Sequence, residues 1–185
     1  MRWFWIDRFT EFESGRAATA IKNVSLAEEH LHDHFPGAPV MPNSLVIEGI
    51  AQTGGLLVAQ HGDFQQRVIL AKLAKARFYF SAVPGDTLTY RATIEDIHKD
   101  GAVVSGTSHV GVRLQAEVQM FFAHLSEAIA GKSLFDPAAL LAMLKLLGVF
   151  EVGRDEQGRR LEVPETLNEE ISRSRASPQP LTPNP

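Results

Sequence analysis

Two residues of this chain could exchange protons with a substrate, and each lies in a different kind of segment. His34 lies in a loop stiffened by prolines, and Glu48 lies inside the apolar run of residues 44–60. A free imidazole titrates near neutral pH and can take up and return a proton there. A carboxyl group among apolar side chains favours its protonated, hydrogen-donating form. The pair therefore predicts general acid–base chemistry, which needs a base and an acid in different surroundings.

Residues around this pair could restrain it and stabilise charge. The loop prolines remove backbone freedom and can hold His34 in place. Gln52 lies four residues after Glu48, on the same helical face, where its amide could orient the carboxyl group. The first turn of the helix offers unpaired backbone N–H groups to a developing enolate oxygen. The orienting or oxyanion-binding candidates are Gly37, Asn43, Ser44 and Gln52.

A long helix and several strands must hold these groups in place. Residues 44–60 are apolar around nearly the whole helical circumference, which is typical of a helix enclosed by protein. A short helical segment is expected at 26–31. Alternating or aromatic-rich patterns predict strands at 3–12, 17–24, 67–80, 87–94 and 112–122. Together they predict an α+β domain in which an antiparallel sheet surrounds a long central apolar helix.

The last of these strands has the most regular alternation. The turn Asp100-Gly101 before it favours a hairpin. One face of the last strand should be buried, with Val112, Leu114, Ala116, Val118, Met120 and Phe122. The opposite face should be polar, with Arg113, Gln115, Glu117 and Gln119.

The sequence pattern changes after residue 125. Asp136 and Pro137 are a capping residue and a first-turn proline, so a helix should begin there, and Gly148 should end it. From Pro164 onward the chain is polar and proline-rich, which predicts a loose tail. We therefore expect a main domain at 1–125, a C-terminal helical extension at 126–163 and a disordered tail at 164–185.

Composition excludes several classes of protein. A net charge of −4 and a pI near 6.0 give no reason to expect nucleic-acid binding. The absence of cysteine excludes disulfides, thiolate nucleophiles and zinc sites built on sulfur. The run 44–60 is short and carries Glu48 and Gln52, so no membrane span is expected. The apolar start is interrupted by Asp7 and Arg8, too early for a signal peptide, which favours a cytoplasmic protein.

The ordered motifs around the two titratable residues resemble a known family. His34-Phe35-Pro36-Gly37, Pro39-Val40-Met41-Pro42 and Glu48 followed by Ala51-Gln52 are similar to the 3-hydroxyacyl-[acyl-carrier-protein] dehydratases. These are hot-dog-fold enzymes of fatty-acid synthesis, here of the type with a catalytic glutamate. The resemblance is collinear over residues 5–124. Its other motifs are Ile6-Asp7-Arg8, Ile21-Lys22-Asn23-Val24-Ser25, Lys75-Ala76-Arg77-Phe78 and Val83-Pro84-Gly85-Asp86.

The resemblance implies a hot-dog fold and a particular reaction. A base at His34 would remove a proton from C2 of a (3R)-3-hydroxyacyl thioester. An acid at Glu48 would protonate the departing C3 hydroxyl, giving trans-2-enoyl-[acyl-carrier-protein] and water. The two residues of one site would come from different subunits, which implies an obligate homodimer and leaves a higher oligomer open. The acyl chain would lie beside the central helix, and no cofactor or metal is implied.

Two features depart from the family pattern. The family usually has glycine at the position of Asn43, near the oxyanion-binding backbone. Asparagine is a good N-cap and tolerates unusual backbone angles, but its side chain could narrow the pocket. The chain also continues from residue 126 beyond the usual end of the smaller family members, so the extension has no role implied by the resemblance.

Other interpretations of the same residues stay open. His30, His32 and His34 alternate and would form a metal site on a strand, but Pro36 disfavours a strand there, so we expect the first two to be solvated. A hot-dog thioesterase would use an acid to activate water. A non-catalytic acyl-carrier or lipid-binding module would need only the pocket. Contact with an acidic carrier protein, or merely a solvated strand face, is expected for Lys72, Lys75 and Arg77.

Overall fold

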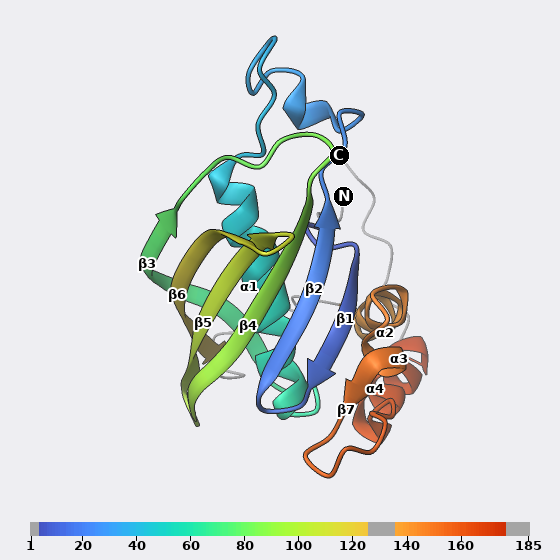
Figure 1. Cartoon of the computed structure of the whole chain (residues 1–185). Coiled ribbons are helices and arrows are strands. Elements are labelled where there is room, and N and C mark those ends of the chain that lie inside the picture. Colours follow the sequence, from blue (N-terminus) through green and yellow to red (C-terminus); the bar gives the residue numbers. More distant parts are fainter. Residues whose placement is uncertain (1–3, 126–135, 177–185) are drawn as a thin grey trace, which may run out of the picture.

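The computed structural model describes residues 4–125 and 136–176, and Figure 1 shows one large sheet lying across a central helix. The strands are β1 (Arg8–Glu13), β2 (Ala17–Asn23), β3 (Arg67–Phe78), β4 (Thr87–His98), β5 (Gly101–Val110), β6 (Arg113–Leu125) and β7 (Gly153–Arg154). The helices are α1 (Asn43–His61), α2 (Pro137–Leu146), α3 (Val149–Val152) and α4 (Glu165–Ala176), with a 3₁₀ turn at Glu29–Leu31. The strand order is β3-β6-β5-β4-β2-β1-β7. Only the β1–β7 pair is parallel among the strand pairs of these described residues.

Helix α1 packs against the middle of the sheet. It contacts strands β2 to β6, and Val46, Ile50 and Leu57 on it are fully buried. Each such side chain stabilises the fold by roughly 1.5–3 kcal/mol when it leaves water. The helix extends one residue beyond the expected run at each end. The predicted α+β architecture, an antiparallel sheet around a central apolar helix, is confirmed.

A β-bulge changes the predicted alternation of β6. Ala116, Val118 and Met120 are buried as expected. The register with β5 shifts near the start of the strand, where Ser108 faces Ala116 but His109 faces Leu114. Gln115 is therefore the extra residue, and it turns inward, fully buried, with its Nε2 donating to the Phe80 carbonyl at 2.9 Å. The prediction that Gln115 lies on the polar face was wrong. Val112, predicted to be buried, is 98% exposed in the preceding turn.

Two further boundaries differ from the sequence-based expectation. The first strand begins at Arg8, not residue 3, and the buried Ile6 precedes it without strand pairing. The helical segment expected at 26–31 is confined to the 3₁₀ turn Glu29–Leu31. The 3₁₀ turn leads into the loop that carries His34, and in Figure 1 this loop extends beyond the end of the sheet, next to the start of α1.

A buried lysine anchors the base of this loop. Lys22 is 6% exposed, and its Nζ donates to Glu28 Oε1 at 2.7 Å and lies 3.7 Å from Asp7 Oδ1. Glu28 Oε2 also accepts the backbone N–H of Ser25 at 3.0 Å. Burial raises the pKa of Glu28, but the hydrogen bonds from Lys22 and Ser25 together outweigh this and hold the pKa below its ordinary value.

The C-terminal extension covers one edge of the sheet. Asp136 caps α2 by accepting the N–H groups of Ala138 and Ala139, and Gly148 ends the following turn with φ 74°, as predicted. Strand β7 then pairs with β1. The sequence predicted a loose tail from residue 164, but the structure has α4 there, and its Leu167 is buried. The remainder of the predicted tail, 177–185, lies outside the described residues, as does 126–135, so the proposed domain division stays a prediction.

No helix in the described ranges 4–125 and 136–176 combines the length and hydrophobicity that a membrane crossing requires.

Helix α1 and strand β4 are in close contact at Gly49. A Cβ added there would lie 2.3 Å from the Tyr90 ring and 2.7 Å from the Trp5 carbonyl oxygen. We expect Gly49→Ala to destabilise the fold by about 1–3 kcal/mol, because a buried ring and a backbone atom must move. Gly55→Ala is the matched control on the same helix, since its nearest neighbour is the Phe122 ring at 3.3 Å and alanine favours helix. Urea unfolding at one protein concentration measures the free energy of unfolding of both variants. An equal loss of stability in the two would contradict this packing.

Acid should weaken the fold partly through Glu28. Because its folded pKa lies below the ordinary value of 4.5, its contribution to stability is present above that pH and is lost as the pH falls through the folded pKa. Glu28→Gln should be less stable than the wild type at neutral pH. The variant should then lose less stability between about pH 6 and pH 3. Thermal unfolding across that range tests this, and parallel losses in the two proteins would argue against it.

Candidate active site

The loop around His34 is closed by its own backbone. The N–H of Val40 donates to the His34 carbonyl at 2.8 Å, and Phe35 and Ala38 exchange hydrogen bonds at 3.3 and 3.0 Å. Gly37 occupies the tip with φ 78°, a conformation that favours glycine. The predicted orienting role of Gly37 is thus accompanied by a conformational one, because it lets the chain reverse between Phe35 and Ala38.

The His34 ring is oriented by a single backbone contact. Its Nδ1 lies 2.9 Å from the Val40 carbonyl oxygen, and the ring stacks on Phe35 with centroids 4.3 Å apart. A carbonyl can only accept a hydrogen bond, so the neutral ring carries its proton on Nδ1. Nε2 is then the basic nitrogen, and the half-buried ring can accept a substrate proton there.

Glu48 lies on α1 with a fixed neighbour. Gln52 Nε2 donates to Glu48 Oε1 at 3.0 Å, which is the contact expected from their spacing on one helical face. Both side chains are half-buried. Gln52 Oε1 accepts the backbone N–H of Trp5 at 2.9 Å. The spacing of residues in the sequence indicated the first of these contacts but not the second, which joins segments 47 residues apart.

The start of α1 differs in detail from the expected cap. Pro42 is the N-cap residue, with no side-chain cap hydrogen bond, and Asn43 is the first helical residue. Asparagine therefore does not cap this helix, contrary to the role considered for it. Asn43 and Ser44 are exposed in the first turn. Backbone N–H groups in the first turn of a helix have no intrahelical acceptor and can bind a negatively charged group.

The other histidines of this region are not arranged as metal ligands. No cluster of three or more His, Asp or Glu residues suited to a metal ion occurs within the described ranges. His32 is exposed, with Nε2 3.2 Å from the Leu26 carbonyl oxygen. His30, expected to be solvated, is instead half-buried with its ring edge-on to Trp5 at 5.1 Å between centroids.

The candidate carrier-contact residues lie on the exposed edge strand β3. Lys75 Nζ pairs with Glu117 at 3.0 Å, and Lys72 Nζ lies 5.7 Å from the centroid of the Phe121 ring. Arg77 is exposed near the end of the strand. Two of the three cations therefore have partners on β6, and the contact with a carrier protein stays a prediction.

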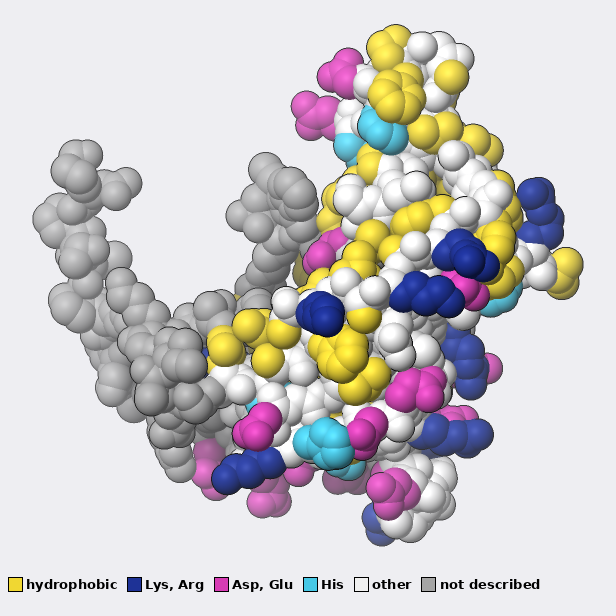
Figure 2. Space-filling view, turned by 90° about the vertical axis from the view of Figure 1, so that its left-hand side faces the viewer, with side chains coloured by type: hydrophobic (Ala, Val, Ile, Leu, Met, Phe, Trp, Pro, Cys, Tyr) yellow, Lys and Arg dark blue, Asp and Glu magenta, His cyan; other side chains and the backbone are white. Residues whose placement is uncertain are grey.

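Strand β3 also presents apolar side chains to solvent. Figure 2 views the molecule from the β3 side and shows hydrophobic groups interspersed with Lys and Arg over this face. We call the β3 face the exposed apolar residues of β3 and of its neighbour β6 along this edge, namely Ile69, Leu70, Leu73 and Phe121, which are 38%, 39%, 39% and 37% exposed. Among the described residues, β3 has a strand neighbour on the β6 side and none on the other. Apolar residues on a long open strand edge mark a place where another chain can pair.

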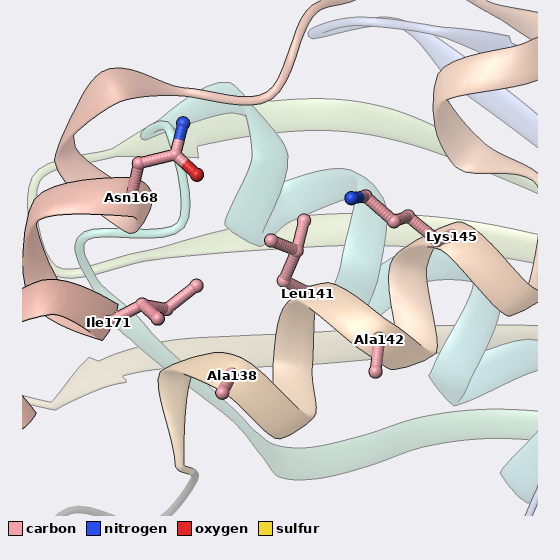
Figure 3. Close-up of a pocket in the computed structure, with 6 residues that line it drawn as sticks. All are labelled: Ala138, Leu141, Ala142, Lys145, Asn168 and Ile171. Atoms are coloured by element: carbon pink, nitrogen blue, oxygen red, sulfur yellow. The ribbon is translucent and has the colours of Figure 1, made fainter. Parts of the chain in front are cut away.

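A separate cavity of about 360 Å³ lies in the C-terminal extension between α2 and α4. Figure 3 shows Leu141 pointing between the two helices, with Lys145 and Asn168 extending toward the same space. None of its lining residues is a predicted site residue. They are Ala138, Leu141, Ala142, Lys145, Asn168 and Ile171.

His34 and Glu48 are not joined within one chain. No hydrogen bond or ion pair links them in the structure of the described residues. The His34 ring is hydrogen-bonded within its own loop, and Glu48 is hydrogen-bonded to Gln52. Within the chain, the structure brings Gln52 to Glu48 and brings Asn43 and Ser44 to the start of the same helix.

Comparisons with known proteins identify the family. Residues 3–119 match the model of the FabA-like domain. The 3-hydroxyacyl-[acyl-carrier-protein] dehydratase FabZ of Pelotomaculum thermopropionicum is 37% identical over 119 residues, covering 64% of this chain and 85% of that protein. FabZ of Moorella thermoacetica is 40% identical over 121 residues, which cover 64% of this chain and 83% of that protein.

The fold is shared with more distant solved structures. One of them is smu.793 from Streptococcus mutans, solved bound to acetyl CoA, whose sequence is 14% identical to this chain. The two structures superpose with a TM-score of 0.56 over 68% of this chain and 94% of that one. This likeness, with the sheet around α1, confirms the predicted hot-dog fold. The chain therefore belongs to the FabA-like family, together with the FabZ-type dehydratases, as its sequence motifs predicted.

Proposed function

We propose that this protein dehydrates (3R)-3-hydroxyacyl-[acyl-carrier-protein] to trans-2-enoyl-[acyl-carrier-protein], with His34 as base and Glu48 as acid. The observation that carries the proposal is the match to FabZ-type dehydratases, since the matched FabA-like domain at 3–119 contains both residues. The reaction belongs to fatty-acid biosynthesis or a related acyl pathway in the cytoplasm. A thioesterase on the same fold is less supported, because the relatives at 32–40% identity are named dehydratases.

The geometry of each side chain suits its proposed role. His34 Nε2 takes the proton from C2, and the bond from Nδ1 to Val40 stabilises the imidazolium that forms. Glu48 gives its proton to the C3 oxygen as the C3–O bond breaks, so that water leaves and a C2–C3 double bond forms. N–H groups in the first turn of α1, at Asn43 and Ser44, stabilise the enolate oxygen of the thioester.

A homodimer completes the proposed site. The β1 edge of the sheet is covered by β7, whereas β3 is the last strand at the other edge within the described ranges and carries the apolar β3 face. A second copy pairing there buries this face. The protruding His34 loop of one subunit, with Phe35 57% exposed, then reaches the Glu48 helix of the other. The acyl chain lies beside α1, and the acidic carrier protein docks near Lys72, Lys75 and Arg77.

Subunit mixing tests the residues and the shared site together. His34→Ala and Glu48→Gln should each lower kcat by about 10²–10⁴-fold, because each removes one proton-transfer group. Refolding equal amounts of the two variants together should restore roughly a quarter of wild-type activity, since half the dimers are mixed and each has one intact site. Water loss from a 3-hydroxyacyl thioester is followed by ultraviolet absorbance of the enoyl product.

Each outcome of this experiment is informative. Wild-type turnover in either single variant would overturn the assigned roles. Inactive single variants without recovery on mixing would place both residues of a site in one chain. Release of free thiol from the same substrate, without enoyl formation, would favour the thioesterase.

A charge on the β3 face should break the dimer. Leu73→Glu places a carboxylate at a half-exposed apolar site in the proposed interface, and burying an unpaired charge is strongly unfavourable. We expect monomers and loss of activity. Val112→Glu is the matched control, because Val112 is 98% exposed in the β5–β6 turn and is not part of the β3 face. Analytical ultracentrifugation measures both, and a dimeric, active Leu73→Glu protein would move the interface elsewhere.

A further inference from the structure

A short chain of hydrogen bonds determines which oxygen of Glu48 can carry a proton. The backbone N–H of Trp5 donates to Gln52 Oε1, and Gln52 Nε2 donates to Glu48 Oε1. A carboxamide has one accepting and one donating end, so the donor from Trp5 forces the donating end toward Glu48. If Trp5 moved away, the amide could turn over and present its oxygen to the carboxyl group.

This orientation has a chemical consequence for the proposed acid. Glu48 Oε1 receives a hydrogen bond, so a protonated Glu48 carries its hydrogen on Oε2. Oε2 is then the atom that gives a proton to the departing hydroxyl. A fixed donor position is valuable because misplacement of a reacting group by about 1 Å can lower a rate 10²-fold.

Trp5 has contacts on two sides, one with α1 and one with the 3₁₀ turn. Its carbonyl oxygen lies so close to Gly49 that a Cβ at that position would be only 2.7 Å away. Its ring meets the edge of the His30 ring, with centroids 5.1 Å apart and planes at 81°. This edge-to-face geometry is a favoured contact between aromatic rings. Trp5 therefore lies between the helix that carries Glu48 and the 3₁₀ turn that leads to His34.

The His30 ring contributes its shape to this contact. Its Nε2 is buried and has no hydrogen-bond partner in the described part of the chain. Burial lowers the pKa of His30, Glu28 raises it, and Lys22 and His34 lower it, with a net pKa below the usual value. This lowered pKa favours the neutral ring, which packs against Trp5 in the edge-to-face contact.

We propose that Trp5 is a positioning residue for Glu48, acting through Gln52, and that His30 holds Trp5 in place. This inference rests on the proposed dehydration and on Glu48 as its acid. It assigns a catalytic consequence to two aromatic residues that touch no reacting atom. Within each chain, the contact also ties the segment that leads to His34 to the helix that carries Glu48.

Substitutions at His30 separate this role from general packing. His30→Ala removes the ring, so we expect kcat to fall about 10-fold while KM changes less than about twofold. His30→Phe keeps an aromatic edge on Trp5 and should restore kcat to within about twofold of the wild type. His32→Ala, at an exposed position two residues further along, is the matched control, and it should leave both constants unchanged.

A double-mutant cycle tests whether the effect passes through Gln52. Gln52→Met removes both hydrogen bonds at similar volume and should itself lower kcat. Adding His30→Ala to Gln52→Met should cause no further loss, since the two residues act in one chain of contacts. Trp5→Leu, which retains the backbone N–H but loses the aromatic contact, is a second route if His30→Ala does not fold by circular dichroism.

The outcomes distinguish this inference from the proposed function. Wild-type kcat in folded His30→Ala or Trp5→Leu, or fully additive losses in the cycle, would overturn the positioning role while His34→Ala and Glu48→Gln stay inactive. Activity in those last two variants would instead overturn the dehydratase mechanism. A loss in His30→Phe as large as in His30→Ala would also count against the proposal, because the aromatic contact would not be what matters.

Discussion

The burial of α1 is the constraint on which the other features depend. An apolar helix with no polar face must be covered on all sides, and a single curved sheet can cover only part of it. Strands β2 to β6 supply that part, with Gly49 allowing the Tyr90 ring of β4 to lie directly against the helix. Glu48 and Gln52 are polar groups on this same helix, so they need partners, and they find them in each other and in the Trp5 backbone.

The two edges of the sheet differ, because one is covered by β7 and the other ends in β3. This asymmetry favours assembly through β3. Strand β7 of the C-terminal extension pairs with β1, so that edge is occupied by the chain itself. Strand β3 ends the strand order of the described residues at the other side and exposes Ile69, Leu70 and Leu73. The His34 loop protrudes from the body and is anchored at its base by the buried Lys22. The proposed homodimer would account for the exposed β3 edge and the protruding loop together.

Local sequence patterns predicted the elements well where one principle dominates. The helix at 44–60 was predicted because apolar residues surround it, and Asp136 with Pro137 predicted the start of α2 through capping chemistry. Predictions failed where a tertiary contact overrides the local sequence pattern. Gln115 points inward because a bulge resets the alternation of β6. Helix α4 forms in a polar segment and buries Leu167, a tertiary contact that composition does not indicate.

The sequence by itself determined the family, the fold class, the candidate base and acid, and the Gln52–Glu48 contact. These depend on residue identity and on spacing along one helix, which a linear pattern records. Only the tertiary structure decided which nitrogen of His34 is free, how the Gln52 amide is turned, and that His30 lies against Trp5. Each of these features depends on a contact across a loop or between distant segments, and local sequence periodicity does not predict such contacts.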